Sequence, residues 1–304
     1  MIVALSGGIG GAKLALGLAH VLAPGALTVI ANTGDDFTHL GLAISPDLDT
    51  LLYTLAGLDN QELGWGRRDE SWAAMETLGA LGGEDWFRLG DRDLALHLLR
   101  TETLRGGATL SAVTARLAAR LGVATRILPA SDDAVRTMLR TDQGWLPFQE
   151  YFVHRRCAPE VREIVFEGAS AARPAPGVTD AIAAAEAVVI CPSNPFISID
   201  PILAVPGVRE ALAATAAPVV AVSPILGGRA VKGPTAKMMA ELGLAVGARA
   251  VAEHYGALLD AFLVEPGDAP ALAGLGARIV AAPILMRDLT EKQALARAVL
   301  AAAR

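Results

Sequence analysis

Four glycines in five positions form the first candidate site of this 304-residue sequence. The segment Ser6-Gly7-Gly8-Ile9-Gly10-Gly11-Ala12-Lys13 lies between a predicted strand and a predicted helix, Ala12–Leu22. Glycines let the backbone approach an anion, and a helix N-terminus attracts negative charge. We expect phosphate contacts from Gly8, Gly10, Gly11 and Lys13. The segment matches neither G-x-G-x-x-G nor the Walker A pattern, and a tight turn without a ligand is the alternative.

Four aspartates follow in two nearby segments, Asn32-Thr33-Gly34-Asp35-Asp36 and Ser45-Pro46-Asp47-Leu48-Asp49. Mg²⁺ prefers one or two carboxylates completed by waters and substrate phosphate. These segments therefore predict a magnesium site, with Asp35 and Asp49 as the favoured ligands, and Asn32 is expected to contact the substrate. The alternative is ordinary turn and helix-cap chemistry, since Asn, Gly and Asp are common in both.

A third candidate is the aromatic and charged segment from Trp86 to Leu94, WFRLGDRDL. Clustered aromatic rings with arginine and aspartate suit a flat aromatic substrate. We expect Trp86, Arg88 and Asp91 to line such a pocket. An aromatic anchor with a local Arg–Asp pair near a helix start is the competing interpretation.

Further polar clusters follow other predicted strands. They contain Ser131 and Asp132, Ser193 and Asn194, and Ser223 with Lys232 after it. The carboxyl ends of parallel strands share one edge of a sheet, and ligands bind there. We expect contacts with a nucleotide or a carboxylate at this edge, although helix capping alone would also explain Ser193 or Asn194.

The elements that must position these residues alternate between β-rich and alanine-rich helical segments, which predicts an α/β, Rossmann-like open parallel sheet flanked by helices. A mainly helical insertion, 45–121, follows the second strand and interrupts a core made of 1–44 and 122–304. Phe148–Val153 and Val161–Phe166 are expected to form an edge β-hairpin. The predicted core strands are Ile2–Leu5, Leu27–Ala31, Thr125–Leu128, Ala187–Cys191, Val219–Val222 and Arg278–Ala282.

Composition excludes several classes of protein. The net charge is −6 and basic runs are absent, which argues against nucleic acid or an anionic membrane as partner. The hydrophobic fraction is 53%, but the longest apolar stretch is broken by Pro218 and Pro224. Cys157 and Cys191 are expected to be buried, reduced thiols. A cytoplasmic enzyme is expected, and a homodimer is plausible.

The sequence resembles the 2-phospho-L-lactate transferase family, which assembles the deazaflavin coenzyme F-420. The glycine segment and N-x-G-D-D also occur in a wider superfamily of nucleotide-sugar-binding regulators, whereas P-D-L-D-T and the Trp86–Leu94 segment favour the transferases. The matching segments are Gly7–Lys13, Asn32–Asp36, Ile44–Leu55, Trp86–Leu94, Ser131–Asp133, Phe148–Glu150, Pro192–Pro195 and Ser223–Ile225.

The resemblance implies a transfer from a guanosine diphosphate-linked three-carbon acid (lactate, enolpyruvate or glycerate) to the ribityl hydroxyl of the deazaflavin Fo, with release of GMP. It implies Mg²⁺ as the metal. The glycine segment, together with Mg²⁺ bound to Asp35 and Asp49, would hold the diphosphate. Asp36 or Asp47 would orient or deprotonate the attacking hydroxyl. Ser193, Asn194, Ser223 and Lys232 would serve the guanosine, and the insertion would receive the deazaflavin.

Two rival functions are compatible with parts of the sequence. A non-catalytic nucleotide-sugar-binding regulator would explain the first two segments but not the insertion. A dinucleotide-dependent oxidoreductase is weakened by Lys13 at the position of the third fingerprint glycine and by the lack of an acidic residue clearly placed to bind a ribose.

Overall fold

The core of the protein is a seven-stranded sheet in which every pair of neighbouring strands is parallel. The computed structural model describes residues 1–231 and 233–304. All six predicted core strands are present, within two residues at each end. The strands, in spatial order, are β14 (Arg278–Ala281), β13 (Ala261–Val264), β10 (Val219–Val222), β9 (Ala187–Ile190), β1 (Ile2–Ser6), β2 (Leu27–Ala31) and β5 (Arg126–Pro129).

Strand β13 was missing from the sequence-based set. Its four residues form a short, wholly buried run directly after a helix. Such a run lacks the alternation of apolar and polar residues that would distinguish a strand from a buried helical segment.

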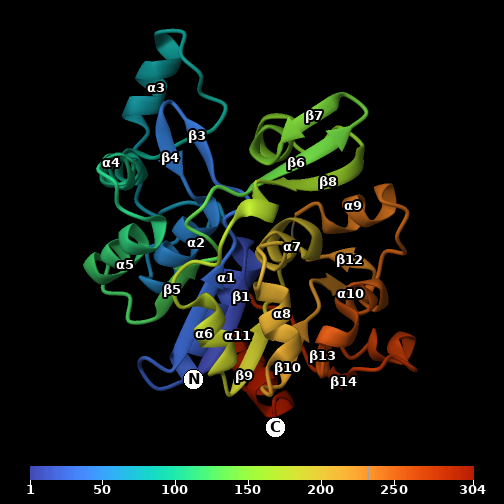
Figure 1. Cartoon of the computed structure of the whole chain (residues 1–304). Helices are drawn as coiled ribbons and strands as arrows, with labels where there is room; N and C mark the ends of the chain where they lie inside the picture. The colour runs from blue at the N-terminus through green and yellow to red at the C-terminus, as the bar shows by residue number, and fades with distance from the viewer. Residues whose placement is uncertain (232) are drawn as a thin grey trace.

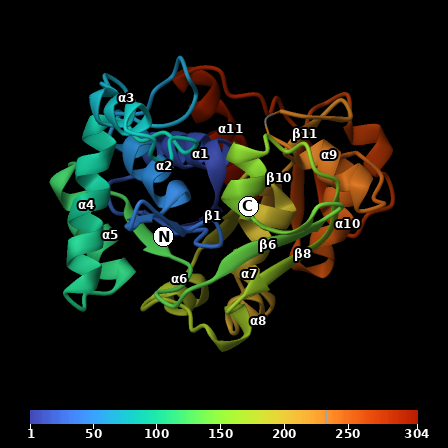
Figure 2. The ribbon, with the colours of Figure 1, turned by 90° about the horizontal axis from the view of Figure 1, so that it is seen from above.

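Helices cover both faces of the sheet, so successive side chains of β1 enter two hydrophobic clusters. Val3 and Leu5 pack with one, and Ile2 and Ala4 with the other. Figure 2 shows α1 and α11 on one side and α6, α7 and α8 on the other. The helices are α1 (Gly8–Val21), α2 (Pro46–Leu55), α3 (Ala73–Ala80), α4 (Asp91–Arg105), α5 (Leu110–Arg120), α6 (Val178–Ala183), α7 (Asp200–Leu203), α8 (Val208–Ala214), α9 (Thr235–Glu241), α10 (Ala248–Tyr255) and α11 (Leu289–Ala302).

The strand order reverses at β1, which lies between β2 on one side and β9 on the other. At such a switch point the connections leave in opposite directions and open a crevice beyond the carboxyl ends of the strands. The glycine segment follows β1, and Pro192–Asn194 follows β9. The topology therefore brings these two segments together at the ligand edge.

The segment between β2 and β5 is mainly helical, as predicted, and contains α2, α3, α4 and α5. The same segment starts with a hairpin that the sequence did not indicate, β3 (Phe37–His39) and β4 (Leu42–Ile44), which lies before α2. Helices α2 and α5 pack into the same hydrophobic cluster as α1. Helix α3 and the β3–β4 hairpin project from the end of the core where the ligand edge lies (Figure 1).

A separate three-stranded antiparallel sheet projects from the same end of the core (Figure 1). Its strands are β6 (Arg136–Thr141), β7 (Gly144–Pro147) and β8 (Val161–Glu167), and a two-stranded hairpin, β11 (Ile225–Leu226) with β12 (Arg229–Ala230), follows β10. A peripheral hairpin is therefore confirmed, and β8 contains the predicted Val161–Phe166.

The assignment of Phe148–Val153 as the partner of that strand was wrong. Strand β7 ends at Pro147, which has no N–H to donate to a ladder, and Glu150–His154 forms a short π-helical turn. Strand β8 pairs instead with β6. Within the described ranges, no helix is long and apolar enough to cross a bilayer.

The crossing of α1 and α11 generates the first prediction. A Cβ added to Gly17 would lie 2.2 Å from the carbonyl oxygen of Lys292. We expect Gly17→Ala to lower the free energy of unfolding by about 2 kcal/mol or more, because the two helices must separate. Gly276→Ala, whose added Cβ meets no atom within 4 Å, should change it by less than about 0.5 kcal/mol. Equal stability of both variants in urea titrations would contradict this account.

Candidate active site

The glycine segment is held from two sides. Helix α1 begins at Gly8, whose φ of +63° lies in the left-handed region. The Gly8 N–H donates to Oδ1 of Asp47 over 2.7 Å. Ser193 Oγ donates to the Gly7 carbonyl over 2.7 Å and accepts from the Gly7 N–H over 3.2 Å. The segments after β1 and β9 are thus joined, as the shared strand edge predicted.

Close packing explains three of the glycines. A Cβ on Gly7 would lie 2.6 Å from Cβ of Ser198, and one on Gly10 would lie 2.5 Å from the carbonyl oxygen of Pro192. At Gly11 it would lie 2.3 Å from Oγ of Ser6. These glycines let α1 begin directly against the neighbouring strand ends, so its first N–H groups face the ligand edge. The arrangement suits an anion at the start of α1.

Asp47 occupies the position of such an anion in this structure. Besides the Gly8 N–H, its carboxylate accepts from Nδ2 of Asn32 over 2.9 Å. Asn32 is fully buried, and its Oδ1 accepts from the Gly34 N–H over 2.7 Å. Burial raises the pKa of Asp47 to about 6, against the effect of these hydrogen bonds. Asp47 therefore links α2 to both strand-end segments.

Asp35 and Asp36 are buried carboxylates that lack a full set of partners. Oδ1 of each has no hydrogen-bond partner, while Oδ2 of Asp36 accepts from the Ser45 hydroxyl over 2.8 Å. Burial, reinforced by the neighbouring Asp47, raises the pKa of Asp35 well above its usual range. Burial also raises the pKa of Asp36, to about 7. Buried acceptors without donors suit a bound cation or a substrate proton.

This pair of oxygens fits the chemistry of Mg²⁺. Among the described residues, no group of three histidine, cysteine, aspartate or glutamate side chains is arranged to enclose a metal ion. Mg²⁺ seldom needs such a cage, because it retains waters and takes substrate phosphate oxygens beside one or two carboxylates. The unpartnered Oδ1 of Asp35 fits the part of a carboxylate ligand in such a site, and Mg²⁺ itself stays a prediction.

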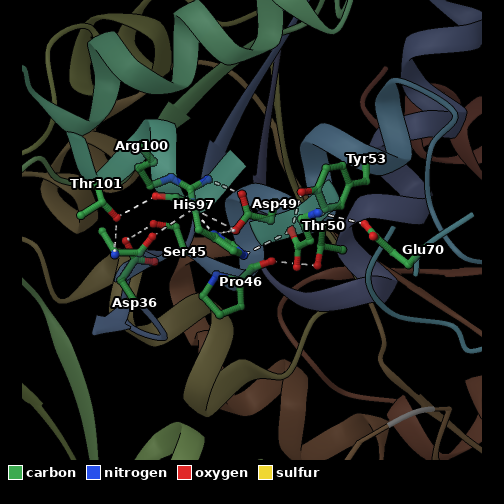
Figure 3. Close-up of polar contacts among 12 residues, drawn as sticks. Asp36, Ser45, Pro46, Asp49, Thr50, Tyr53, Glu70, His97, Arg100 and Thr101 are labelled. Atoms are coloured by element: carbon green, nitrogen blue, oxygen red, sulfur yellow. Dashed lines mark hydrogen bonds and ion pairs between the residues drawn. The ribbon is translucent and has the colours of Figure 1, made fainter. Parts of the chain in front are cut away.

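Asp49, the other predicted ligand, directs both oxygens toward Arg100 (Figure 3). Nη1 of Arg100 donates to Oδ2 over 3.0 Å, and Nη2 donates to Oδ1. Arg100 is only 1% exposed, so this is a buried ion pair. Burial opposes the charge of Arg100, but the Asp49 carboxylate raises the pKa of Arg100 above its usual value. Any contribution of Asp49 to a cation competes with this pair.

The ion pair continues into a buried polar network on α4. Nε2 of His97 lies 3.2 Å from Oδ1 of Asp93, and the Tyr53 hydroxyl donates to the same oxygen. Glu70 accepts from the N–H of Asp93 over 2.9 Å at the start of the helix. The network fixes α4 to α2, which carries Asp47 and Asp49 (Figure 3).

An aromatic cluster begins at the residue after Asp36. Phe37 packs edge-on against Phe87, with ring centroids 4.8 Å apart, and its centroid lies 6.2 Å from that of Trp86. His39 packs against the same two rings. Phe37 opens the β3–β4 hairpin directly after Asp36, so the half-buried indole of Trp86 packs on the segment that follows the aspartates. Contact of Trp86 with a flat substrate stays a prediction.

Arg88 and Asp91 point elsewhere. The guanidinium of Arg88 lies 4.7 Å from the ring centroid of Trp72. Asp91 accepts from the Ser71 hydroxyl over 2.7 Å and from the N–H groups of Ala73 and Ala74, at the start of α3. The structure therefore assigns both residues a local role in the insertion and does not bring them to Trp86. Their contact with substrate stays a prediction.

The remaining predicted residues also have structural partners, and their contacts with substrate stay predictions. Lys232 lies outside the described residues. Lys13 donates to the Met286 carbonyl, Ser131 to the Arg173 carbonyl and Ser223 to the Ile225 carbonyl, while Asp132 accepts from Ser111 and Asn194 from the Phe196 N–H.

The sequence analysis missed two contributors besides Arg100. Strand β6 reaches the segment after β2, where the Thr137 N–H donates to the Gly34 carbonyl over 2.8 Å. Arg136, next to it, lowers the pKa of Asp36 electrostatically. The only signal in the sequence was an arginine and a threonine in an alternating run, which is typical of any half-exposed strand.

Comparison with known proteins identifies the family of the chain. The family profile described as 2-phospho-L-lactate transferase CofD matches residues 2–285. The chain belongs to this family. A relative from Streptomyces griseus named phosphoenolpyruvate transferase is 48% identical over 305 residues, which cover 97% of this chain and 96% of that one. The protein of the same name from Thermobifida fusca is 45% identical, over 98% of this chain and 96% of that one.

The fold of this chain is also similar to that of solved structures. A member of the UPF0052 family from Bacillus halodurans superposes with a TM-score of 0.60, over 98% of each chain, at 17% sequence identity. At that identity the likeness concerns the fold alone. It supports the Rossmann-like architecture of the transferase chain.

The burial of Asp36 generates a prediction for the metal-free protein. Because its pKa is raised from 3.8 to about 7, its contribution to stability is present below about pH 4 and is lost as the pH rises through about 7. In a chelator at pH 8, Asp36→Asn should therefore raise the free energy of unfolding by about 1–3 kcal/mol, and by less at pH 4. Asp69→Asn, an exposed control, should have no such pH dependence. A less stable Asp36→Asn at pH 8 would contradict this.

The buried ion pair between Arg100 and Asp49 leads to another prediction about stability. Arg100→Met leaves the Asp49 carboxylate buried without its partner, and we expect a loss of about 3–5 kcal/mol in the free energy of unfolding. Adding Asp49→Leu should recover most of that loss, because an apolar pair replaces the ion pair. Denaturant titration of both variants checks this, and additive losses in the double variant would show that the pair is not the cause.

Proposed function

We propose that the protein transfers a phosphoenolpyruvyl group from a guanosine diphosphate-linked donor to the ribityl hydroxyl of the deazaflavin Fo, releasing GMP, in the biosynthesis of coenzyme F-420. The observation that carries this proposal is the meeting of the start of α1 with buried aspartates at one edge of the sheet. Asp47 accepts from the Gly8 N–H, and Asp35 and Asp36 each keep an unpartnered Oδ1. Family membership and the names of the relatives favour enolpyruvate over lactate or glycerate.

In this proposal the hydroxyl oxygen of Fo forms a bond to the phosphorus that bears the three-carbon acid. The bond from that phosphorus to the bridging oxygen breaks, and GMP leaves with the electron pair. Such transfers depend mainly on positioning and charge stabilisation. The N–H groups at the start of α1 face the diphosphate, and the guanosine lies toward Ser193, Asn194 and Ser223.

Asp36 is the residue best placed to take the proton of the attacking hydroxyl. Its Oδ1 is unpartnered, burial raises its pKa to about 7, and the next residue, Phe37, belongs to the aromatic cluster. Asp47 engages both oxygens in hydrogen bonds to Gly8 and Asn32, so its part is to align the helix start with the strand ends.

Mg²⁺ would be held by Asp35 with the diphosphate oxygens, and it would supply charge neutralisation at the transferred phosphate. Asp49 would act chiefly through Arg100, which adds a fixed positive charge behind the carboxylates. The insertion, 45–121, would form the acceptor side of the site through Trp86.

The direct test supplies the protein with Fo, Mg²⁺ and each GDP-linked acid, lactate, enolpyruvate or glycerate, and identifies the product by mass. We expect GMP and the enolpyruvyl product to form fastest. Asp36→Asn should lower kcat by about 100-fold or more, because proton transfer contributes at least that much. Asp69→Asn should leave kcat unchanged.

One outcome would refute the proposed transfer, and another would overturn only the assignment of its base. Absence of product with all three donors, together with tight binding of a UDP-sugar, would favour the non-catalytic regulator. Normal turnover of Asp36→Asn would remove Asp36 as the base while leaving the transfer intact.

A further inference from the structure

The indole of Trp86 has one ring neighbour that differs from the others. Phe37, His39 and Phe87 meet it at interplanar angles of 35°, 67° and 73°. The imidazole of His154 is instead stacked on it, with planes 13° apart and centroids separated by 5.2 Å. Among the described residues, no other aromatic ring is stacked parallel to this indole. His154 therefore covers a flat face of Trp86, and the other three rings support the indole at steeper angles.

The two stacked residues come from different parts of the chain. Trp86 belongs to the insertion before α4, whereas His154 ends the π-helical turn after β7. Nδ1 of His154 lies 2.8 Å from Oε2 of Glu150, and Oε1 of the same glutamate accepts from Nε of Arg155. The side chain of His154 is 48% exposed. The stack is thus a contact between two segments that lie outside the parallel sheet.

We propose that Trp86 and His154 form a slot for the ring system of the acceptor, with His154 as its outer wall. This inference rests on the proposed function and names a further residue of the acceptor site. Aromatic atoms in contact lie about 3.5 Å apart, so a planar ring between two others requires outer rings about 7 Å apart. Rings in stacked contact have planes about 3.5 Å apart, so the planes of Trp86 and His154 must separate by about 3.5 Å to admit a third ring. In this proposal the half-exposed side chain of His154 makes that movement.

The position of the slot suits the chemistry. Phe37, which packs against Trp86, opens the β3–β4 hairpin directly after Asp36. That hairpin and the three-stranded sheet both project from the end of the core where the ligand edge lies (Figure 1). The slot is formed by the flat faces of an indole and an imidazole, which favours planar aromatic ligands.

The experiment measures binding of Fo and turnover separately in matched variants. The dissociation constant for Fo comes from a fluorescence titration without donor, and KM for Fo and for the donor from product formation. We expect His154→Ala to raise both values for Fo by about 3- to 10-fold, the range of one aromatic stack, and to leave KM for the donor unchanged. His154→Phe should restore wild-type values. Arg155→Ala, which removes the other partner of Glu150 without touching Trp86, is the matched control and should resemble the wild type.

The outcomes separate the inference from the proposed function. An unchanged or lowered dissociation constant for Fo in His154→Ala would overturn the slot, the lowered value showing that His154 merely blocks Trp86. No binding of Fo to the unaltered protein would overturn it as well. Binding of Fo that weakens in His154→Ala, without turnover of any donor, would support the slot while refuting the proposed transfer.

Discussion

The burial of four carboxylates beside one arginine is the constraint on which the site depends. Asp35, Asp36, Asp47 and Asp49 are each less than a tenth exposed, and Arg100 forms a buried ion pair with Asp49. The remaining negative charge is met by backbone N–H groups, by hydroxyl and amide donors, and by raised pKa values. Such a site has more buried negative than positive charge, so it favours binding of a cation or a proton. The uncompensated charge lowers the free energy of unfolding.

Close approach of the backbone makes this concentration of charge possible. Without side chains at Gly7, Gly10 and Gly11, the start of α1 packs against the ends of β1 and β9. Asp47 can then reach the Gly8 N–H from another helix. The glycine segment is therefore both a packing device and the positive end of a helix, and the same residues serve both needs.

Sequence patterns identified the parallel sheet, the helical insertion and the edge at which the glycines and aspartates meet, because those features follow from local periodicity and from strand direction. They did not reveal β13, whose four buried residues carry no period, or the β3–β4 hairpin. Nor did they pair Arg100 with Asp49, since fifty-one residues separate the two and only the docking of α4 on α2 joins them. Partners of buried charges are a property of tertiary packing, which no short segment records.

That long separation has a consequence for how the protein acquires its site. The carboxylate of Asp49 on α2 has its counter-charge only where α4 is docked, because Arg100 belongs to that helix. A buried carboxylate without its partner is strongly unfavourable, so the burial of Asp49 and the docking of α4 are coupled. An undocked α4 therefore means a hydrated acidic edge, and the cleft and the folded insertion are stable only together.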